Sequence, residues 1–313
     1  MLPIVFPSQI NWFYELQAHS IAKELVLAGT PARAIAADAV DEAPENPGSA
    51  VLIVNLAECI LSAERSGQRR QLLSTLHSFE RRILLNYDSI YSNWFKRQFE
   101  DQPRLITEIF DVCMKPQAKY FVRGLPYSWI AEAFTDSELR SLLDRRPDRP
   151  VPWAIIGHAT PDRAAFASAA QETLGSSGFA FLPPLRPYQK ATGLGDRELM
   201  RILERCDFYL WNSHHEFPYH EGFRALHAIR AGALPAKIDP LNWRHFTDVP
   251  WVYRSLTDLK ERRDRIGLQR LYKEARDFVL HHGTVGRNLA GALRNVATEI
   301  DSVGDRLLKL QGR

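Results

Sequence analysis

The side chains with the greatest potential for chemistry gather in one stretch, HHEFPYHEGFRALHAIRAGALPA, which covers residues 214 to 236. It holds four of the chain's ten histidines, together with Glu216, Glu221 and Arg224. Three kinds of site use these residue types: a zinc site, a catalytic loop, and a helix start that binds an anion.

The spacing of the histidines argues against zinc. A zinc-protease helix places two histidines four residues apart on one face, whereas His215 and His220 are five apart with Pro218 between them. Proline disfavours a helix there, and no cysteine lies near enough to complete a tetrahedral ligand set. The sequence also contains no Asp-x-Asp pair that would hold a diphosphate-bound metal. We therefore expect no metal or other cofactor, and a solvated loop around His214.

The second half of the stretch indicates an anion site. Glu221, Gly222 and Phe223 precede a helical pattern, and the strand pattern DFYLWNS comes just before them. The unpaired amides at a helix start, together with the helix dipole, favour a phosphate. Gly222 lets the backbone approach a ligand closely, and Arg224 offers a bidentate contact. A helix start after a strand is common, so the pattern alone has low specificity.

A similar arrangement is expected at an earlier strand, which ends at Gly157. Thr160 or Asp162 caps the helix that follows, and Arg163 lies in its first turn. A basic residue in a first turn opposes the helix dipole. Either an external anion or an ion pair with Asp162 or Glu172 explains its presence.

Strand and helix patterns alternate on both sides of a proline-rich, charged segment from Asp144 to Trp153, which we interpret as a linker. The strand patterns are continuous in apolar residues, as in parallel sheets covered on both faces. We therefore predict an α/β protein with two Rossmann-like doubly wound domains facing a cleft, where ligands bind at the carboxyl ends of the strands. The tail from Asp258 to Leu310 is predicted to be helical, with breaks near Gly283 and Gly286.

The composition excludes several classes of protein. The chain has 313 residues, which suits two domains, and a net charge of only +3, so nothing calls for nucleic acid. No apolar run approaches the roughly 20 residues of a membrane helix, and the amino terminus does not resemble a signal peptide. The three cysteines lie far apart, as reduced core thiols do. We expect a cytoplasmic protein without an integral membrane segment.

Three motifs in order resemble glycosyltransferases of the GT-B fold, especially the spore-maturation (CgeB-like) branch and its family 4 relatives. The first runs from Gly157 to Arg163, and the second from Ser213 to Pro235. The third is HHGTVGRNL, with Thr284 and Arg287. The order and spacing cover most of residues 151 to 295, whereas the first half resembles the family only in its strand–helix rhythm and in LLNYDSIYSNWF.

The resemblance implies that residues 151–295 form a nucleotide-sugar domain, in which Arg163 and the amides around Gly222 hold a pyrophosphate. His227 stands where the family has a glutamate that holds the donor ribose, and the partner position falls on Tyr219 instead of a glutamate. The donor-binding residues that the resemblance implies are Gly157, His158, Arg163, Ser213, Glu221, Gly222, Phe223, Arg224 and His227.

The resemblance further implies an acceptor domain over residues 1–145 and a last helix, 296–313, that packs back on it. The function we expect is metal-independent transfer of a sugar from a nucleotide-sugar to a glycan, lipid-linked or protein acceptor. Arg163 would stabilise the departing phosphate, and Asp88 is the candidate base for an inverting mechanism. Retaining chemistry stays open, and His19 is more typical of a helix face.

A second hypothesis comes from a different class: a non-catalytic GT-B-like subunit that binds a nucleotide, a carbohydrate or a partner. The histidine at position 227 motivates it, as does the first loop, FPSQINW, which is not rich in glycine.

Overall fold

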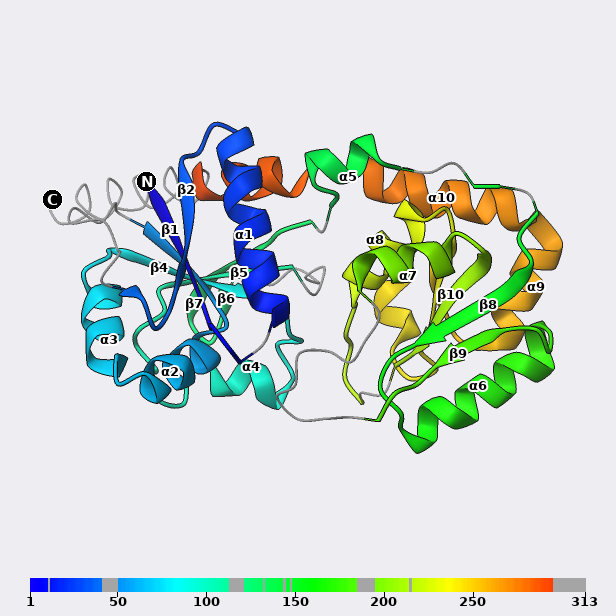
Figure 1. The fold of residues 1–313 in the computed structure, drawn as a ribbon, viewed down its shortest axis with the longest axis horizontal. Helices are drawn as coiled ribbons and strands as arrows, with labels where there is room; N and C mark the ends of the chain where they lie inside the picture. The colour runs from blue at the N-terminus through cyan, green and yellow to red at the C-terminus, as the bar shows by residue number, and fades with distance from the viewer. Residues whose placement is uncertain are drawn as a thin grey trace, which may run out of the picture. The chain divides into compact units, whose positions relative to one another are not determined.

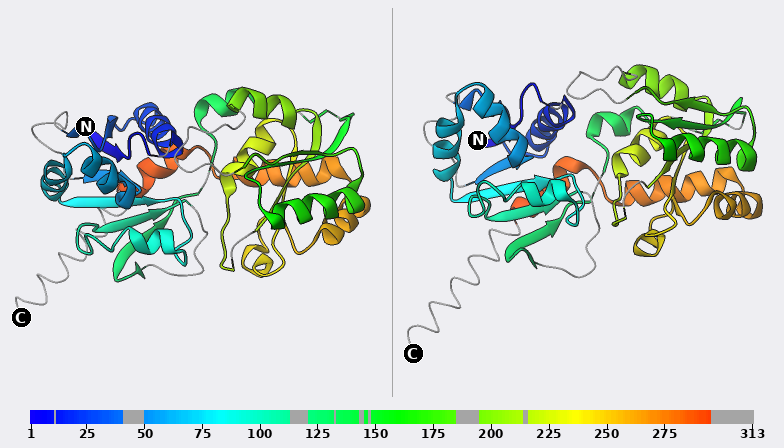
Figure 2. Two further views of the ribbon diagram at one scale, coloured as in Figure 1. Left: turned by 60° about the horizontal axis from the view of Figure 1, so that its bottom comes forward. Right: turned by 90° about the horizontal axis from the view of Figure 1, so that it is seen from below.

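The computed structural model describes residues 1–10, 12–40, 50–112, 121–131, 133–142, 145–146, 148–184, 195–213 and 216–294 (Figure 1). The chain forms two compact units, the first from Met1–Tyr87, Arg97–Ala131 and Gly283–Arg313, and the second from Asp88–Lys96 and Glu132–His282. Each unit is a parallel sheet flanked by helices, which the two further views in Figure 2 also show. The prediction of two Rossmann-like α/β domains is therefore confirmed.

The sheet of the first unit has seven strands in the order β2-β1-β3-β4-β5-β7-β6, all parallel except the edge strand β6. Continuous apolar runs such as AVLIV in β3 are buried, because helices cover both faces. The sequence patterns did not predict α2, α4, β6 or β7. The elements are β1 (Leu2–Phe6), α1 (Trp12–Leu27), β2 (Ala32–Ala36), β3 (Ala50–Val54), α2 (Leu56–Arg65), α3 (Arg69–His77), β4 (Arg81–Asn86), β5 (Glu108–Asp111), β6 (Phe121–Val122) and β7 (Leu125–Trp129), with α4 (Asn93–Arg97) between β4 and β5.

The chain returns to the first unit at Gly283, earlier than the residue 296 expected from the sequence. Gly283 has φ of 75° and does interrupt the helical tail, but Gly286 does not, because it lies inside a helix over residues 285–294. A Cβ on Gly286 would lie 2.4 Å from the carbonyl oxygen of Glu24 in α1. Glycine at this position therefore allows two helices to pack closely. The expected helix 296–313 lies outside the described residues.

The sheet of the second unit has five parallel strands in the order β12-β11-β10-β8-β9. Its strands are β8 (Val151–Ile156), β9 (Phe179–Phe181), β10 (Cys206–Asn212), β11 (Leu234–Ile238) and β12 (Val252–Tyr253). Its helices are α5 (Asp136–Arg140), α6 (Pro161–Leu174), α7 (Asp196–Leu203), α8 (Gly222–Arg230), the 3-10 helix η2 (Trp243–Phe246), α9 (Leu256–Ile266) and α10 (Leu268–His281).

Both sheets share one topology. Counted within each unit, the first five parallel strands have the spatial order 2-1-3-4-5. The connections leave the first strand in one direction and the third strand in the other. Right-handed crossovers then place α6 on one face of the second sheet and α7 and α8 on the opposite face. The strand order reverses between β1 and β3 in the first unit and between β8 and β10 in the second, which are the places where doubly wound sheets bind ligands.

The segment interpreted as a linker is part of the second unit. The Arg145 guanidinium donates to the carbonyl oxygen of Gly232 at 3.2 Å. The Arg149 guanidinium donates to the carbonyl oxygens of Leu203 and Cys206, both at 2.8 Å. These buried contacts fix the segment to the ends of α7 and α8, so the chain crosses between units at residues 131 and 132 instead.

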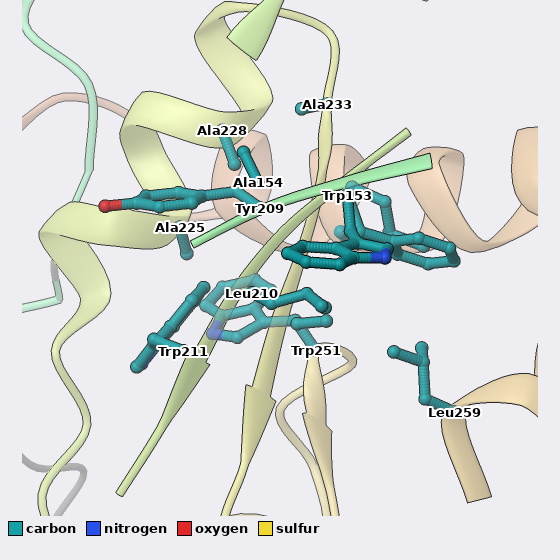
Figure 3. Close-up of a cluster of buried hydrophobic side chains, with 14 of the residues drawn as sticks. Trp153, Ala154, Tyr209, Leu210, Trp211, Ala225, Ala228, Ala233, Trp251 and Leu259 are labelled. Atoms are coloured by element: carbon teal, nitrogen blue, oxygen red, sulfur yellow. The ribbon is translucent and has the colours of Figure 1, made fainter. Parts of the chain in front are cut away.

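The core of the second unit is rich in aromatic side chains (Figure 3). Trp153 of β8, Tyr209 and Trp211 of β10, and Trp251 are all buried. Each such side chain removes roughly 150–250 Å² from water, and Trp153 also donates its indole N–H to the carbonyl oxygen of Gly175 at 2.9 Å. This packing holds β8 and β10 rigidly, and both strands end at the candidate site.

Candidate anion-binding site

The site lies at the carboxyl ends of β8 and β10, which are neighbours in the sheet and pair up to Ile155 and Leu210. The chain leaves β8 toward β9 on one side and leaves β10 toward β11 on the other. The amino-terminal turns of α6 and α8 follow these two strands, so both helix starts belong to the switch point of the sheet.

Arg163 turns back from the first turn of α6 over the end of β8. Thr160 caps the helix, because its side-chain oxygen accepts the Arg163 amide at 3.2 Å. The Arg163 guanidinium donates to the carbonyl oxygen of His158 at 2.9 Å. A Cβ on Gly157 would lie 3.1 Å from the guanidinium carbon, so glycine leaves room for this close approach. No ion pair with Asp162 or Glu172 is among the contacts described for Arg163, whose electrostatic neighbours are Arg224, Glu221 and Tyr209.

Arg224 joins the start of α8 to the end of β8. Its guanidinium donates to the carbonyl oxygen of Ile156 at 3.0 Å, to the Tyr209 hydroxyl at 2.8 Å and to the Glu221 carboxylate at 3.2 Å. Glu221 is buried and has a left-handed backbone, with φ of 52°. Its side chain makes no capping hydrogen bond to α8, because the carboxylate is engaged by Arg224.

Burial and neighbouring charges shift the pKa values of three side chains of the site, Arg224, Arg163 and His158. Burial by itself would lower the pKa of Arg224, yet Tyr209 and Glu221 beside it raise that pKa overall. Burial, and after it the charge of Arg224, lowers the pKa of Arg163. Burial together with the two arginine charges lowers the pKa of His158. The two guanidinium charges and the lowered pKa of the His158 imidazole favour an anion at this site.

Lys237 is a site component that sequence reasoning missed. It lies in β11 and is fully buried, with its ammonium 3.0 Å from the Asp239 carboxylate, and it donates to the carbonyl oxygen of Tyr219. The only signal in the sequence is a lysine within an otherwise apolar strand, LPAKI.

The side chain of His220 is part of the core. Its ring stacks on Phe246 and Trp251, with centroids 5.8 and 5.7 Å apart. Burial, and then the charge of Lys237, lowers its pKa to about 3, so the imidazole is neutral. His214 and His215 lie outside the described residues. Within the part of the chain that the structure describes, no group of three or more candidate ligands could hold a metal ion.

The remaining predicted donor residues lie after β10 and on α8. Ser213 follows β10, and its backbone amide donates a hydrogen bond to the carbonyl oxygen of Ile238 at 2.9 Å. Phe223 and His227 lie one turn apart on α8, with ring centroids 6.5 Å apart. His227 is half-buried.

The residues expected to act outside this site have separate positions. Asp88 follows β4 and is half-buried, and burial raises its pKa to about 6. His19 is exposed on α1, as expected for a residue on a helix face, and the centre of its ring lies 5.3 Å from that of Phe6. Thr284 is buried and its hydroxyl accepts the amide of Arg287 at 3.5 Å, at the start of the helix over residues 285–294.

No protein-family model matches the chain, and no curated protein matches it. A crystal structure of an alpha1,3-fucosyltransferase is similar over 93% of this chain and 88% of that chain, with 9% sequence identity and a TM-score of 0.49. A likeness at this level concerns the fold alone, so function has to be argued from the residues of the site. Among the described helices, none has the length and apolar character required to cross a membrane.

Proposed function

We propose that the protein is a glycosyltransferase that binds the diphosphate of a nucleotide-sugar between the starts of α6 and α8. One observation carries the proposal: Arg163 and Arg224, from two different helix starts, both donate to main-chain carbonyl oxygens at the end of β8, those of His158 and Ile156. A diphosphate offers charge and acceptor oxygens for both guanidinium groups and for helix amides.

The arrangement fits the chemistry of a leaving diphosphate. As the sugar–phosphate bond breaks, negative charge builds up on the departing oxygen, and fixed donors that face it lower the barrier. Arg224 is held by three protein acceptors and so is already oriented. Among the described residues, Arg163 donates to the carbonyl oxygen of His158, and its guanidinium has further N–H groups for a ligand. Because two arginines supply the charge, the proposed reaction needs no metal.

Residues 151–295 were expected to form the donor domain, and we retain that role for the part of them within the second unit. We assign the acceptor, a glycan, lipid-linked or protein hydroxyl, to the first unit. Asp88, which belongs to the second unit and not to the amino-terminal domain expected from the sequence, is the proposed base, since a carboxylate with a pKa near 6 accepts a proton better than an ordinary aspartate. The buried free thiols of Cys59 and Cys206 fit a reducing, cytoplasmic setting.

A second candidate function is binding without turnover. The observation that favours it is His227, a half-buried histidine on α8 at the position where a carboxylate would hold the donor ribose. An imidazole still exchanges hydrogen bonds with a hydroxyl, but it does not replace the charge.

Nucleotide-sugar hydrolysis and transfer, measured across a donor panel with and without EDTA, separates the two functions. The glycosyltransferase proposal predicts turnover of at least one donor that survives chelation. Binding without turnover favours the second candidate. Turnover that EDTA abolishes and one metal restores would refute metal independence.

A further inference from the structure

We infer that Lys237 is a positioning residue for the donor site, because it fixes the turn from which α8 begins. That the turn preforms a diphosphate site rests on the proposed function. That Lys237 fixes the turn rests only on the contacts of Lys237 itself.

The side chain of Lys237 is 0% exposed, and that of its partner Asp239 is 1% exposed. The ammonium donates to the Asp239 carboxylate at 3.0 Å and to the carbonyl oxygen of Tyr219. It also lies 5.1 Å from the centre of the Phe246 ring. The second oxygen of Asp239 accepts the amide of Asn242 at 2.9 Å. The lysine thus connects the end of β11 to main chain two residues before Glu221.

The next residue is held independently. The His220 ring lies nearly parallel to those of Phe246 and Trp251, at 21° and 22°. Glu221 then adopts its left-handed conformation and pairs with Arg224. Because residues 219 and 220 are both anchored, the direction in which α8 starts is set before any ligand arrives.

Stability alone does not account for the buried lysine. Replacing a buried ion pair by apolar or neutral groups of similar volume is often neutral or stabilising. An apolar side chain at position 237 would complete the burial pattern of β11, in which every residue is buried. What such a side chain could not supply is a donor for the Tyr219 carbonyl oxygen.

The test is the double variant Lys237→Met/Asp239→Asn, which removes both charges and keeps an acceptor for Asn242. Its matched control is Lys260→Met/Asp264→Asn, the same two changes in an exposed ion pair of 3.0 Å on α9. Hydrogen exchange of the ligand-free protein is expected to be at least about tenfold faster in residues 216–226 of the double variant, and unchanged in β8 and β10. Affinity for UDP, GDP or ADP is expected to fall by about tenfold. The control should change neither quantity.

Unchanged exchange in residues 216–226 of the folded double variant would overturn the inference. If the wild-type protein binds no nucleoside diphosphate, the proposed function fails, while exchange still decides whether Lys237 fixes the turn. If the double variant does not fold, hydrogen exchange of the wild-type protein tests whether the turn is held in place. Protection of residues 219–224 comparable to that of β10 supports the inference, and exchange within seconds contradicts it.

Discussion

The helices α2 and α8 occupy equivalent places in the two units, since each follows the third strand of a 2-1-3-4-5 sheet at its switch point. Each begins after a residue with a left-handed backbone, Asn55 with φ of 58° and Glu221 with φ of 52°. Topology and backbone are therefore alike, and the difference lies in what the side chains do.

In the first unit the helix start is closed by the chain itself. The Asn55 side-chain oxygen accepts the amide of Glu58 at 3.1 Å, and the Gln98 side-chain oxygen accepts that of Ala57 at 3.1 Å. Gln98 also donates to Asn55 at 2.9 Å. In the second unit Glu221 turns to Arg224 and makes no capping bond. One topology therefore gives a helix start that is capped by a side chain in the first unit and a helix start without a side-chain cap in the second.

The largest expected effect is on Arg224. Arg224→Ala leaves the Glu221 carboxylate, whose side chain is 6% exposed, without its charged partner. Breaking a buried pair in this way costs about 3–5 kcal/mol in the free energy of unfolding. Urea unfolding measures the loss, and Arg224→Ala/Glu221→Gln should recover a large part of it. Equal losses in the single and double variants would show that the pair is not the cause.

A smaller effect is expected in the self-capped helix. Asn55→Ala removes a cap and places alanine in a left-handed conformation, which together cost roughly 2–3 kcal/mol. In Asn55→Gly the glycine adopts the left-handed conformation without strain, so this variant should lose less stability than Asn55→Ala. Nucleoside diphosphate affinity should stay at the wild-type value in both variants, because this helix start is not the proposed site. A fall in affinity that matches the loss of stability would contradict the proposed difference between the starts of α2 and α8.

Acid should weaken the second unit through His220. Its pKa of about 3 in the folded state lies below the unfolded value of about 6.5. The folded state thus favours the neutral ring, and this contribution to stability is present above pH 6.5 and lost as pH falls toward 3. His220→Phe keeps the stacking and should flatten the pH dependence of unfolding between pH 6.5 and 4. The exposed control His77→Gln should not, and parallel curves for all three proteins would contradict the assignment.

The smallest expected effect concerns His227 on α8. If this side chain faces the donor ribose, His227→Glu adds a carboxylate acceptor for two hydroxyl groups. A net gain of roughly 0.5–1.5 kcal/mol corresponds to about two- to tenfold tighter nucleoside diphosphate binding. The matched control is a 2′,3′-dideoxynucleoside diphosphate, which should gain nothing. Equal tightening for both ligands would place the effect elsewhere than at the ribose.

The fold was largely predictable because its signals are local. Continuous apolar runs such as those of β3 and β10 are typical of strands buried on both faces, and Thr160 and Pro161 mark the start of α6. Helix α2 was missed because it follows β3 directly, with Asn55 as the only residue between them. The charged, proline-rich segment predicted a linker, since nothing in the sequence shows that Arg145 reaches the end of α8.

The candidate site was predictable only in part, because only some of its residues carry a local signal in the sequence. Arg163 and Arg224 lie beside helix starts in the sequence, so local patterns indicated both. The role of Lys237 depends on two tertiary contacts: β11 pairs with β10, and the carbonyl oxygen of Tyr219 accepts a hydrogen bond from the Lys237 ammonium. His220 was weighed as a zinc ligand because of its residue type and rejected because of its spacing, but its packing between the rings of Phe246 and Trp251 could not be predicted from the sequence.

The most direct test of the central claim is calorimetric titration of UDP, GDP and ADP into the wild-type protein and Arg163→Ala. The matched control is Arg197→Ala, an exposed arginine at the start of α7 in the same unit. Loss of one charged hydrogen bond, about 1.5–3 kcal/mol, predicts a ten- to hundredfold weaker affinity in Arg163→Ala and no change in the control. Wild-type affinity in Arg163→Ala, or an equal loss in both variants, would contradict a diphosphate site between α6 and α8.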